Sequence, residues 1–67
     1  GVPAHLVNLC RIPNIGKVRA KKLYDYGIKS VDDFSQVSEE KLRKLLNLKE
    51  DIVKAMLIES SKLSLTS

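Results

Sequence analysis

Four basic side chains gather in the first turns of a helix that the sequence predicts from Lys17. They are Lys17, Arg19, Lys21 and Lys22. In the turn just before it, Asn14 and Gly16 are residue types that tolerate positive φ, which a sharp reversal requires. The first N–H groups of a helix have no partner within it, and that end carries a positive partial charge. These residues at this spacing therefore predict an anion site that suits a phosphate.

Two short helices joined by a tight hairpin would position this site. Pro13 lacks an amide hydrogen and disfavours helix for the residue before it, so the first helix should stop near Arg11. The second helix, expected over 17–26, has apolar positions at Ala20, Leu23 and Tyr24, and Gly27 follows as its C′ residue. The stretch 9–28 is thus interpreted as helix, hairpin and helix.

This stretch resembles the helix-hairpin-helix motif. The matching positions are Leu9, Ile12, Asn14-Ile15-Gly16, Ala20, Leu23 and Gly27-Ile28. Asn14 stands where the family's first glycine usually sits, which puts a side chain where a DNA backbone would approach. The resemblance implies binding to nucleic-acid backbones through the amides around the hairpin, without reading sequence. The implied DNA-binding residues are Asn14, Ile15, Gly16, Lys17, Val18, Arg19, Lys21 and Lys22.

A longer stretch, 1–34, is similar to the C-terminal domain of the archaeal Hjm and animal HELQ type of superfamily 2 DNA helicases. The family's two paired basic positions fall on Arg19 and Lys21, the second matched only conservatively. The resemblance implies an accessory domain of a DNA repair helicase that grips a single strand. Its implied partners are single-stranded or branched DNA and the rest of the parent helicase, which would bind the ATP.

Charge and composition narrow the function classes. The 67-residue chain has a net charge of +4. Residues 1–30 carry six basic residues and one acidic residue, whereas residues 31–67 carry six basic and seven acidic residues, so the positive field belongs to the hairpin half. A solvated basic helix face is the plainer alternative.

Enzymatic chemistry is not expected of this chain. It has no GxxxxGK[ST] motif, no paired carboxylates, no nucleophile with a base and no metal-ligand set, so we expect no cofactor and no metal. A lone cysteine, Cys10, is expected to be a buried, inert thiol, and His5 a surface residue. Without a signal peptide or a long apolar run, an intracellular protein of the cytoplasm, nucleoid or nucleus is expected, with no membrane partner.

The fold class expected is all-α, a compact five-helix bundle with a domain over 1–63 and a frayed tail over 64–67. The first helix should begin at Pro3 and turn Leu6, Val7, Leu9 and Cys10 inward. Ser30 and Ser38 are predicted to cap helices over 31–36 and from 39 to the break at Asn47, and Asp33 should complete a capping box with Ser30. A last helix is expected over 49–62.

A weak internal repeat appears at an offset of 33 residues. Leu9, Ile12, Asn14, Ile15, Ala20 and Leu23 align with Leu42, Leu45, Asn47, Leu48, Val53 and Met56. The repeat predicts two pseudo-symmetric hairpin units, the second of them degenerate. Glu50 and Asp51 replace Lys17 and Val18 there; carboxylates at that place stabilise a helix start and repel phosphate, so the second unit is interpreted as structural.

Three side chains leave alternatives open. Val18 either contacts a DNA backbone or packs on the hairpin, and Tyr26 either stacks on a base or is partly buried. Ile58 falls opposite the apolar stripe of the last helix, so it is either an ordinary exposed residue or part of a docking surface. The competing function is therefore a protein–protein interaction module of a larger DNA-processing protein, and RNA remains an alternative to DNA because backbone contacts discriminate poorly.

Overall fold

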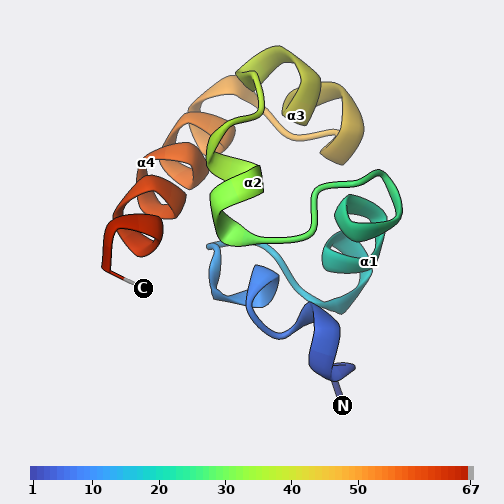
Figure 1. Ribbon diagram of the computed structural model, residues 1–67. Coiled ribbons are helices and arrows are strands. Elements are labelled where there is room, and N and C mark those ends of the chain that lie inside the picture. Colours follow the sequence, from blue (N-terminus) through green and yellow to red (C-terminus); the bar gives the residue numbers. More distant parts are fainter. Residues whose placement is uncertain (67) are drawn as a thin grey trace.

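The computed structural model describes residues 1–66, which fold into helices without a strand (Figure 1). The chain runs through 3₁₀ turns at Ala4–Leu6 and Leu9–Arg11 and then through four α-helices. These are α1 (Lys17–Asp25), α2 (Val31–Ser35), α3 (Glu39–Leu46) and α4 (Glu50–Thr66). The expected all-α fold is confirmed. The expected count of five helices is not, because the 3₁₀ turns replace the first α-helix.

The N-terminal segment differs from the continuous helix predicted from Pro3. Its backbone bonds all span three residues, as in Leu6 N–H to the carbonyl of Pro3 and Ile12 N–H to that of Leu9. Leu6, Leu9 and Ile12 recur every third residue, and a 3₁₀ turn with three residues per turn places that spacing on one stripe. All three are buried, whereas Val7, predicted to point inward, is exposed and Cys10 is only half-buried.

Serine side chains cap two of the helices, as predicted. Ser30 Oγ accepts a hydrogen bond from the amide of Asp33 at 2.9 Å, and Ser38 Oγ accepts one from the amide of Lys41 at 3.2 Å. The return half of the capping box is displaced by one residue, since Asp33 Oδ2 accepts from the amide of Lys29 at 3.0 Å. Both helices also begin with acidic residues, which favour the positive helix end.

The helix ends follow the local signals with small shifts, and α1 stops at Asp25, one residue earlier than expected. Gly27 (φ 102°) and Asn47 (φ 55°) adopt the positive φ that ends α1 and α3, as predicted. α2 stops one residue earlier than expected. α4 continues to Thr66 instead of ending near Lys62, and Ser64 Oγ donates to Asp32 Oδ1 at 2.8 Å. Ser67 lies outside the described residues.

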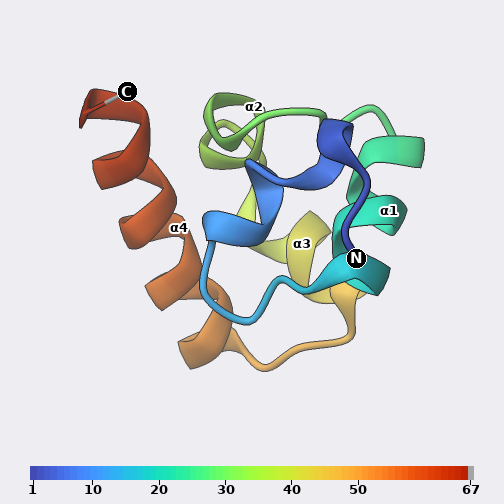
Figure 2. The same cartoon turned by 90° about the horizontal axis from the view of Figure 1, so that it is seen from below.

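The helices enclose one apolar core. α2 and α3 pack on α4, while the two 3₁₀ turns pack on α1 and lie between α1 and α4 when the molecule is seen from below (Figure 2). The buried apolar side chains are Leu6, Leu9, Ile12, Ile15, Ala20, Leu23, Ile28, Val31, Phe34, Leu42, Leu46, Val53 and Met56. Ser60 is also fully buried, and its hydroxyl donates to the carbonyl of Leu57. Within residues 1–66, no helix has the length and apolar character needed to cross a bilayer.

Candidate nucleic-acid interface

The first hairpin turns at Asn14, which adopts the left-handed conformation with φ 67°. Gly16, the other residue of this turn that tolerates positive φ, does not adopt it. Its backbone is extended, with φ −98° and ψ −168°, and it serves as the N-cap of α1. A Cβ atom built on Gly16 would meet nothing within 4 Å. The asparagine alone makes the reversal, and the glycine leaves open space beside the helix start.

The start of α1 presents unpartnered backbone amides. No side chain caps this helix. The first helical hydrogen bond of α1 is donated by the amide of Ala20 to the carbonyl of Gly16, at 2.9 Å. Within the described chain, the amides of Lys17, Val18 and Arg19 therefore have no protein acceptor. These donors and the positive end of the helix face the same open space as the Gly16 backbone.

The basic side chains of this helix differ in their partners. Lys21 Nζ lies 2.6 Å from Asp25 Oδ2, an exposed pair. Arg19 bends back to the hairpin, where its Nη1 donates to the Asn14 carbonyl at 3.0 Å. Among the described residues, no carboxylate lies within 4.0 Å of Lys17, Arg19 or Lys22. Three cationic groups therefore remain available to an anion at this surface.

The hairpin and the start of α1 carry two apolar residues, of which Ile15 is buried and Val18 is exposed. Ile15 is 4% exposed and its amide donates to the carbonyl of Ile12, so both its side chain and its N–H serve the fold. Ile15, one of the DNA-binding residues that the resemblance implies, therefore has neither an exposed side chain nor a free amide to offer a ligand. Val18 is 82% exposed and does not pack on the hairpin, which removes one of its two alternatives.

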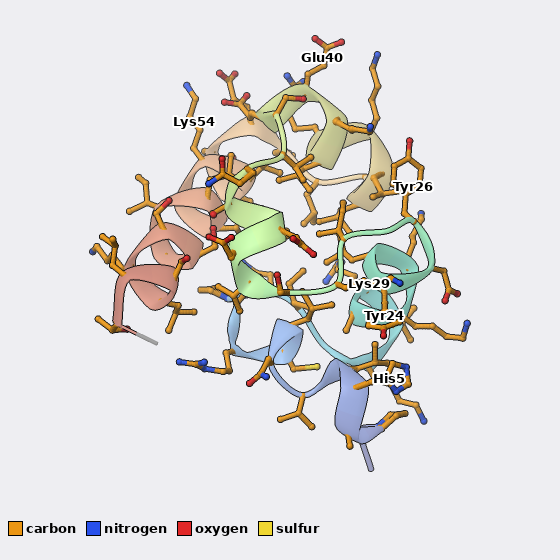
Figure 3. All side chains as sticks on the ribbon, viewed as in Figure 1. His5, Tyr24, Tyr26, Lys29, Glu40 and Lys54 are labelled. Carbon is orange, nitrogen blue, oxygen red and sulfur yellow. The ribbon has the colours of Figure 1, made fainter. Side chains whose placement is uncertain are left out.

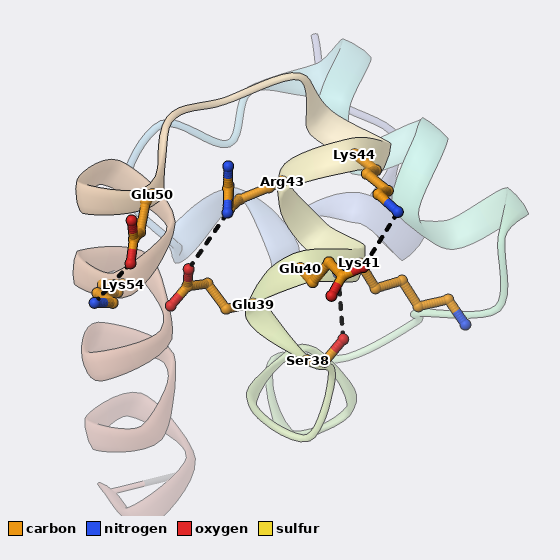
Figure 4. Close-up of polar contacts among 8 residues, drawn as sticks. All are labelled: Ser38, Glu39, Glu40, Lys41, Arg43, Lys44, Glu50 and Lys54. Atoms are coloured by element: carbon orange, nitrogen blue, oxygen red, sulfur yellow. Dashed lines mark hydrogen bonds and ion pairs between the residues drawn. The ribbon is translucent and has the colours of Figure 1, made fainter.

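The second hairpin has a similar turn and a different helix start. Asn47 adopts the left-handed conformation, and the amide of Val53 donates to the carbonyl of Lys49, but the first turn of α4 carries Glu50 and Asp51. Its neighbourhood is neutralised by ion pairs (Figure 4). These join Arg43 to Glu39, Lys44 to Glu40 and Lys54 to Glu50.

The Glu50–Lys54 pair shows how closely this charge is balanced. Their charged atoms lie 2.9 Å apart. The hydrogen bond from Lys54 holds the pKa of Glu50 below its ordinary value, and the bond to Glu50 raises the pKa of Lys54. Both groups therefore stay charged across the neutral range, so the Glu50 carboxylate persists at this helix start and Lys54 is held by it.

Two tyrosine rings at α1, those of Tyr24 and Tyr26, make contacts with neighbouring side chains (Figure 3). Lys29 Nζ is 5.3 Å from the centre of the Tyr24 ring, and the rings of Tyr24 and His5 meet in a T-shaped contact with their centres 4.8 Å apart. Lys41 Nζ of α3 is 5.1 Å from the centre of the Tyr26 ring. Sequence reasoning did not find the Lys41 contact, because no local spacing links α1 to α3. Within residues 1–66, no group of three potential metal ligands converges.

Comparisons with known proteins agree with this geometry. The family model of SAM-like helix-hairpin-helix tandem domains matches residues 6–62. The chain belongs to this family. It is also 28% identical over 57 residues to the ATP-dependent DNA helicase Hel308 of Thermoplasma acidophilum. That match covers 85% of this chain and 8% of the helicase, so the chain spans a small part of this relative. No solved structure matches the chain significantly.

Proposed function

We propose that this chain binds DNA through the phosphodiester backbone, without reading base sequence, at the first hairpin. The observation that carries the proposal is the uncapped start of α1, with free amides at Lys17, Val18 and Arg19 behind an open glycine. A phosphate oxygen is the acceptor that fits several convergent N–H groups at a positive helix end. Backbone amides see the same phosphate at every step, so such contacts position a protein without specifying sequence.

The charged side chains extend the contact beyond one phosphate. Lys17 and Lys22 have no carboxylate partner among the described residues, and they can reach phosphates on either side of the one held by the amides. Arg19 braces the hairpin through the Asn14 carbonyl while its guanidinium stays at the surface. Lys21 can contribute after exchanging Asp25 for a phosphate, because an exposed pair is weak.

The parent context of this activity follows from the similarity to a DNA helicase. We infer that the chain serves as an accessory domain of an ATP-dependent DNA helicase that acts in DNA repair, on single-stranded or branched DNA. The similarity to an ATP-dependent DNA helicase supports this inference, as does the tandem helix-hairpin-helix family. The domain would supply binding, and the ATP-driven chemistry would belong to the remainder of that larger protein.

We further infer that the two hairpins are copies of one unit, of which only the first binds phosphate. Three observations support the relation at the 33-residue offset. Asn14 and Asn47 both have positive φ, α1 and α4 begin 33 positions apart, and buried Ala20 and Leu23 correspond to buried Val53 and Met56. Glu50 and Asp51 give the second unit the wrong charge for an anion.

A salt series tests the proposal directly. Fluorescence anisotropy would follow binding of the chain to labelled single-stranded, duplex and forked DNA of unrelated sequences, and to an RNA strand. With two to four phosphates contacted, the slope of log affinity against log salt should be about −0.7 to −0.9 per phosphate, nearly independent of sequence. An affinity that does not change with salt would refute backbone binding, and exclusive RNA binding would favour the RNA alternative.

A protein-interaction role has one specific observation in its favour. Ile58 is 58% exposed, and Leu65, seven residues further along α4, is exposed on the same face. Exposed apolar residues at helical spacing are typical of a surface that docks on a partner. Replacement of Ile58 by aspartate should abolish such docking in the longer protein without changing DNA affinity, so the two roles can be measured separately.

A further inference from the structure

Tyr26 is the one aromatic ring beside the basic surface of α1 that the phosphate site leaves unexplained. It follows the last residue of α1 and is 55% exposed. Figure 3 shows it projecting from the end of α1 next to α3, apart from the group formed by Tyr24, His5 and Lys29. More than half of this tyrosine is therefore open to a ligand that offers an apolar face.

The basic residues of α1 lead from the hairpin to this ring. The amide of Tyr26 donates to the carbonyl of Lys22, one helical turn earlier, and Arg19 lies three residues before Lys22. Residues at these spacings share one face of a helix. The rise from residue 19 to residue 26 is about 10 Å, which three stacked nucleotides at about 3.4 Å each would span.

The ammonium group of Lys41 lies over the Tyr26 ring. Lys41 Nζ lies 5.1 Å from the centre of the Tyr26 ring, and no carboxylate of residues 1–66 lies within 4.0 Å of Lys41. The neighbouring carboxylates are already engaged, because Asp25 binds Lys21 and Glu40 binds Lys44. In Figure 4 the Lys41 side chain extends away from the Glu40–Lys44 ion pair. The surface around the ring is therefore positive.

We propose that Tyr26 is a stacking platform for an unpaired base of a single strand whose phosphates lie along α1. This inference rests on the proposed function and sharpens it, because it assigns the domain a preference for single strands. Proteins that bind single strands without sequence preference combine a cationic track with exposed aromatic rings, since every base offers a π-face. Bases within a duplex are stacked on each other, so the ring would contribute nothing to duplex binding.

The test compares Tyr26→Ala and Tyr26→Phe on an oligothymidylate and on a blunt duplex at one salt concentration. Loss of the ring should lower single-strand affinity about fivefold to a hundredfold, the range measured for stacking of one base, and should leave duplex affinity unchanged. The phenylalanine variant keeps the ring and should bind like the original chain. Ile58→Ala, which truncates a side chain of similar exposure on α4, is the matched control and should change neither affinity.

A second measurement leaves Tyr26 in place. The chain has two tyrosines and no tryptophan, so in a Tyr24→Phe variant the tyrosine fluorescence comes from Tyr26 alone. Oligothymidylate should quench this emission and duplex DNA should not. Equal losses on both DNAs, an unchanged Tyr26→Ala variant or unquenched emission would each overturn the stacking role while leaving backbone binding intact. Absence of any salt-dependent DNA affinity would overturn both proposals together.

Discussion

Asn14 and Asn47 adopt the same left-handed conformation, and a helix begins three residues after each of them. What surrounds the two helix starts differs. Around α1, Lys17, Arg19 and Lys22 lack a carboxylate partner among residues 1–66, whereas at α4 the acidic first turn is tied to Lys54. The turn alone therefore does not make a phosphate site, because the charge and the capping of the following helix decide whether an anion can bind there.

The remaining helices extend this comparison. α2 and α3 begin with a serine whose hydroxyl occupies one backbone amide, and each has two acidic residues in its first turn. Among the α-helices whose N-cap is described, α1, α2 and α3, only α1 has no side-chain hydrogen bond at its N-cap and no acidic residue in its first turn. Because capping groups and ligands compete for the same N–H groups, an uncapped basic start is the feature that stability alone would not favour.

Charge reversal at the first hairpin should have the largest effect. Lys17→Glu with Lys22→Glu should lower DNA affinity about tenfold or more at low salt and reduce the salt slope by about two, because each lysine contacts one phosphate. The control, Lys54→Glu with Lys62→Glu, changes the net charge equally on α4. Anisotropy titrations of both variants separate local from global charge, and equal losses would contradict the assignment to the first hairpin.

Substitution of the two asparagines should affect stability alike and binding unequally. A β-branched residue in the left-handed conformation costs about 1–2 kcal/mol, so Asn14→Val and Asn47→Val should each lower the free energy of unfolding by that amount. Only Asn14→Val should also weaken DNA binding, because it distorts the hairpin at the phosphate. Urea denaturation and DNA titration measure the two effects. Asn14→Gly, which tolerates the left-handed conformation, should keep the stability and the DNA affinity of the original chain.

A serine at Gly16 should make the first hairpin resemble the capped helices. The site has room for the side chain, and a serine N-cap is a few tenths of a kcal/mol more stable than glycine. Its hydroxyl would occupy an amide that the phosphate needs, so DNA affinity should fall about two- to tenfold. Gly16→Ala, which adds Cβ without the hydroxyl, is the control; unimpaired binding by Gly16→Ser would show that the amides are not used.

Neutralising the second hairpin should raise DNA affinity only modestly. Glu50→Gln with Asp51→Asn removes two negative charges from the start of α4, yet Lys49 still stands where the first hairpin has its open glycine. We expect an increase of about threefold at most at low salt, as for an added favourable charge near exposed phosphates. A decrease in affinity would indicate that DNA lies on the second hairpin through other contacts.

The pH dependence of the Glu50–Lys54 pair should be the smallest effect, because both groups are fully exposed. Because the pKa of Glu50 is lowered in the folded chain, its ion pair stabilises the fold at pH values above the pKa of the unfolded chain, near 4.5. This stability is lost as the pH falls through the pKa of the folded chain. Because the pKa of Lys54 is raised in the folded chain, its ion pair stabilises the fold at pH values below the pKa of the unfolded chain, 10.5. This stability is lost as the pH rises through the pKa of the folded chain. In Glu50→Gln, the urea midpoint plotted against pH should fall less than in the original chain at the acid end and at the alkaline end. An unchanged fall at the acid end would show that the pair contributes nothing to stability.

Much of the fold could be predicted because its signals are local. Ser30, Ser38, Gly27 and Asn47 each act within one turn of their position, and the structure places the helix boundaries beside them. The spacing of three in Leu6, Leu9 and Ile12 was compatible with an α-helix as well as with a 3₁₀ turn. Packing of this stripe against α1 is a tertiary contact, so the pattern could not decide between the two.

The candidate site was predictable in composition and only partly in geometry. The basic residues and the helix start follow from residue types, but the backbone of Gly16 does not, because glycine adopts extended and left-handed conformations with equal ease. The burial of Ile15 and the exposure of Tyr26 depend on which helix covers which face. Lys41 joins the Tyr26 ring from another helix, a contact between residues 15 positions apart.

The all-helical class, the two asparagine turns, the serine caps and the concentration of positive charge in the first half follow from residue types and local spacing. These features depend on interactions between neighbours in the chain. Which cations stay unpaired beside the free amides of α1, and which ring remains exposed beside them, depends on how the helices pack. Burial and charge pairing between helices are set by packing, because distant residues compete for the same core and the same surface.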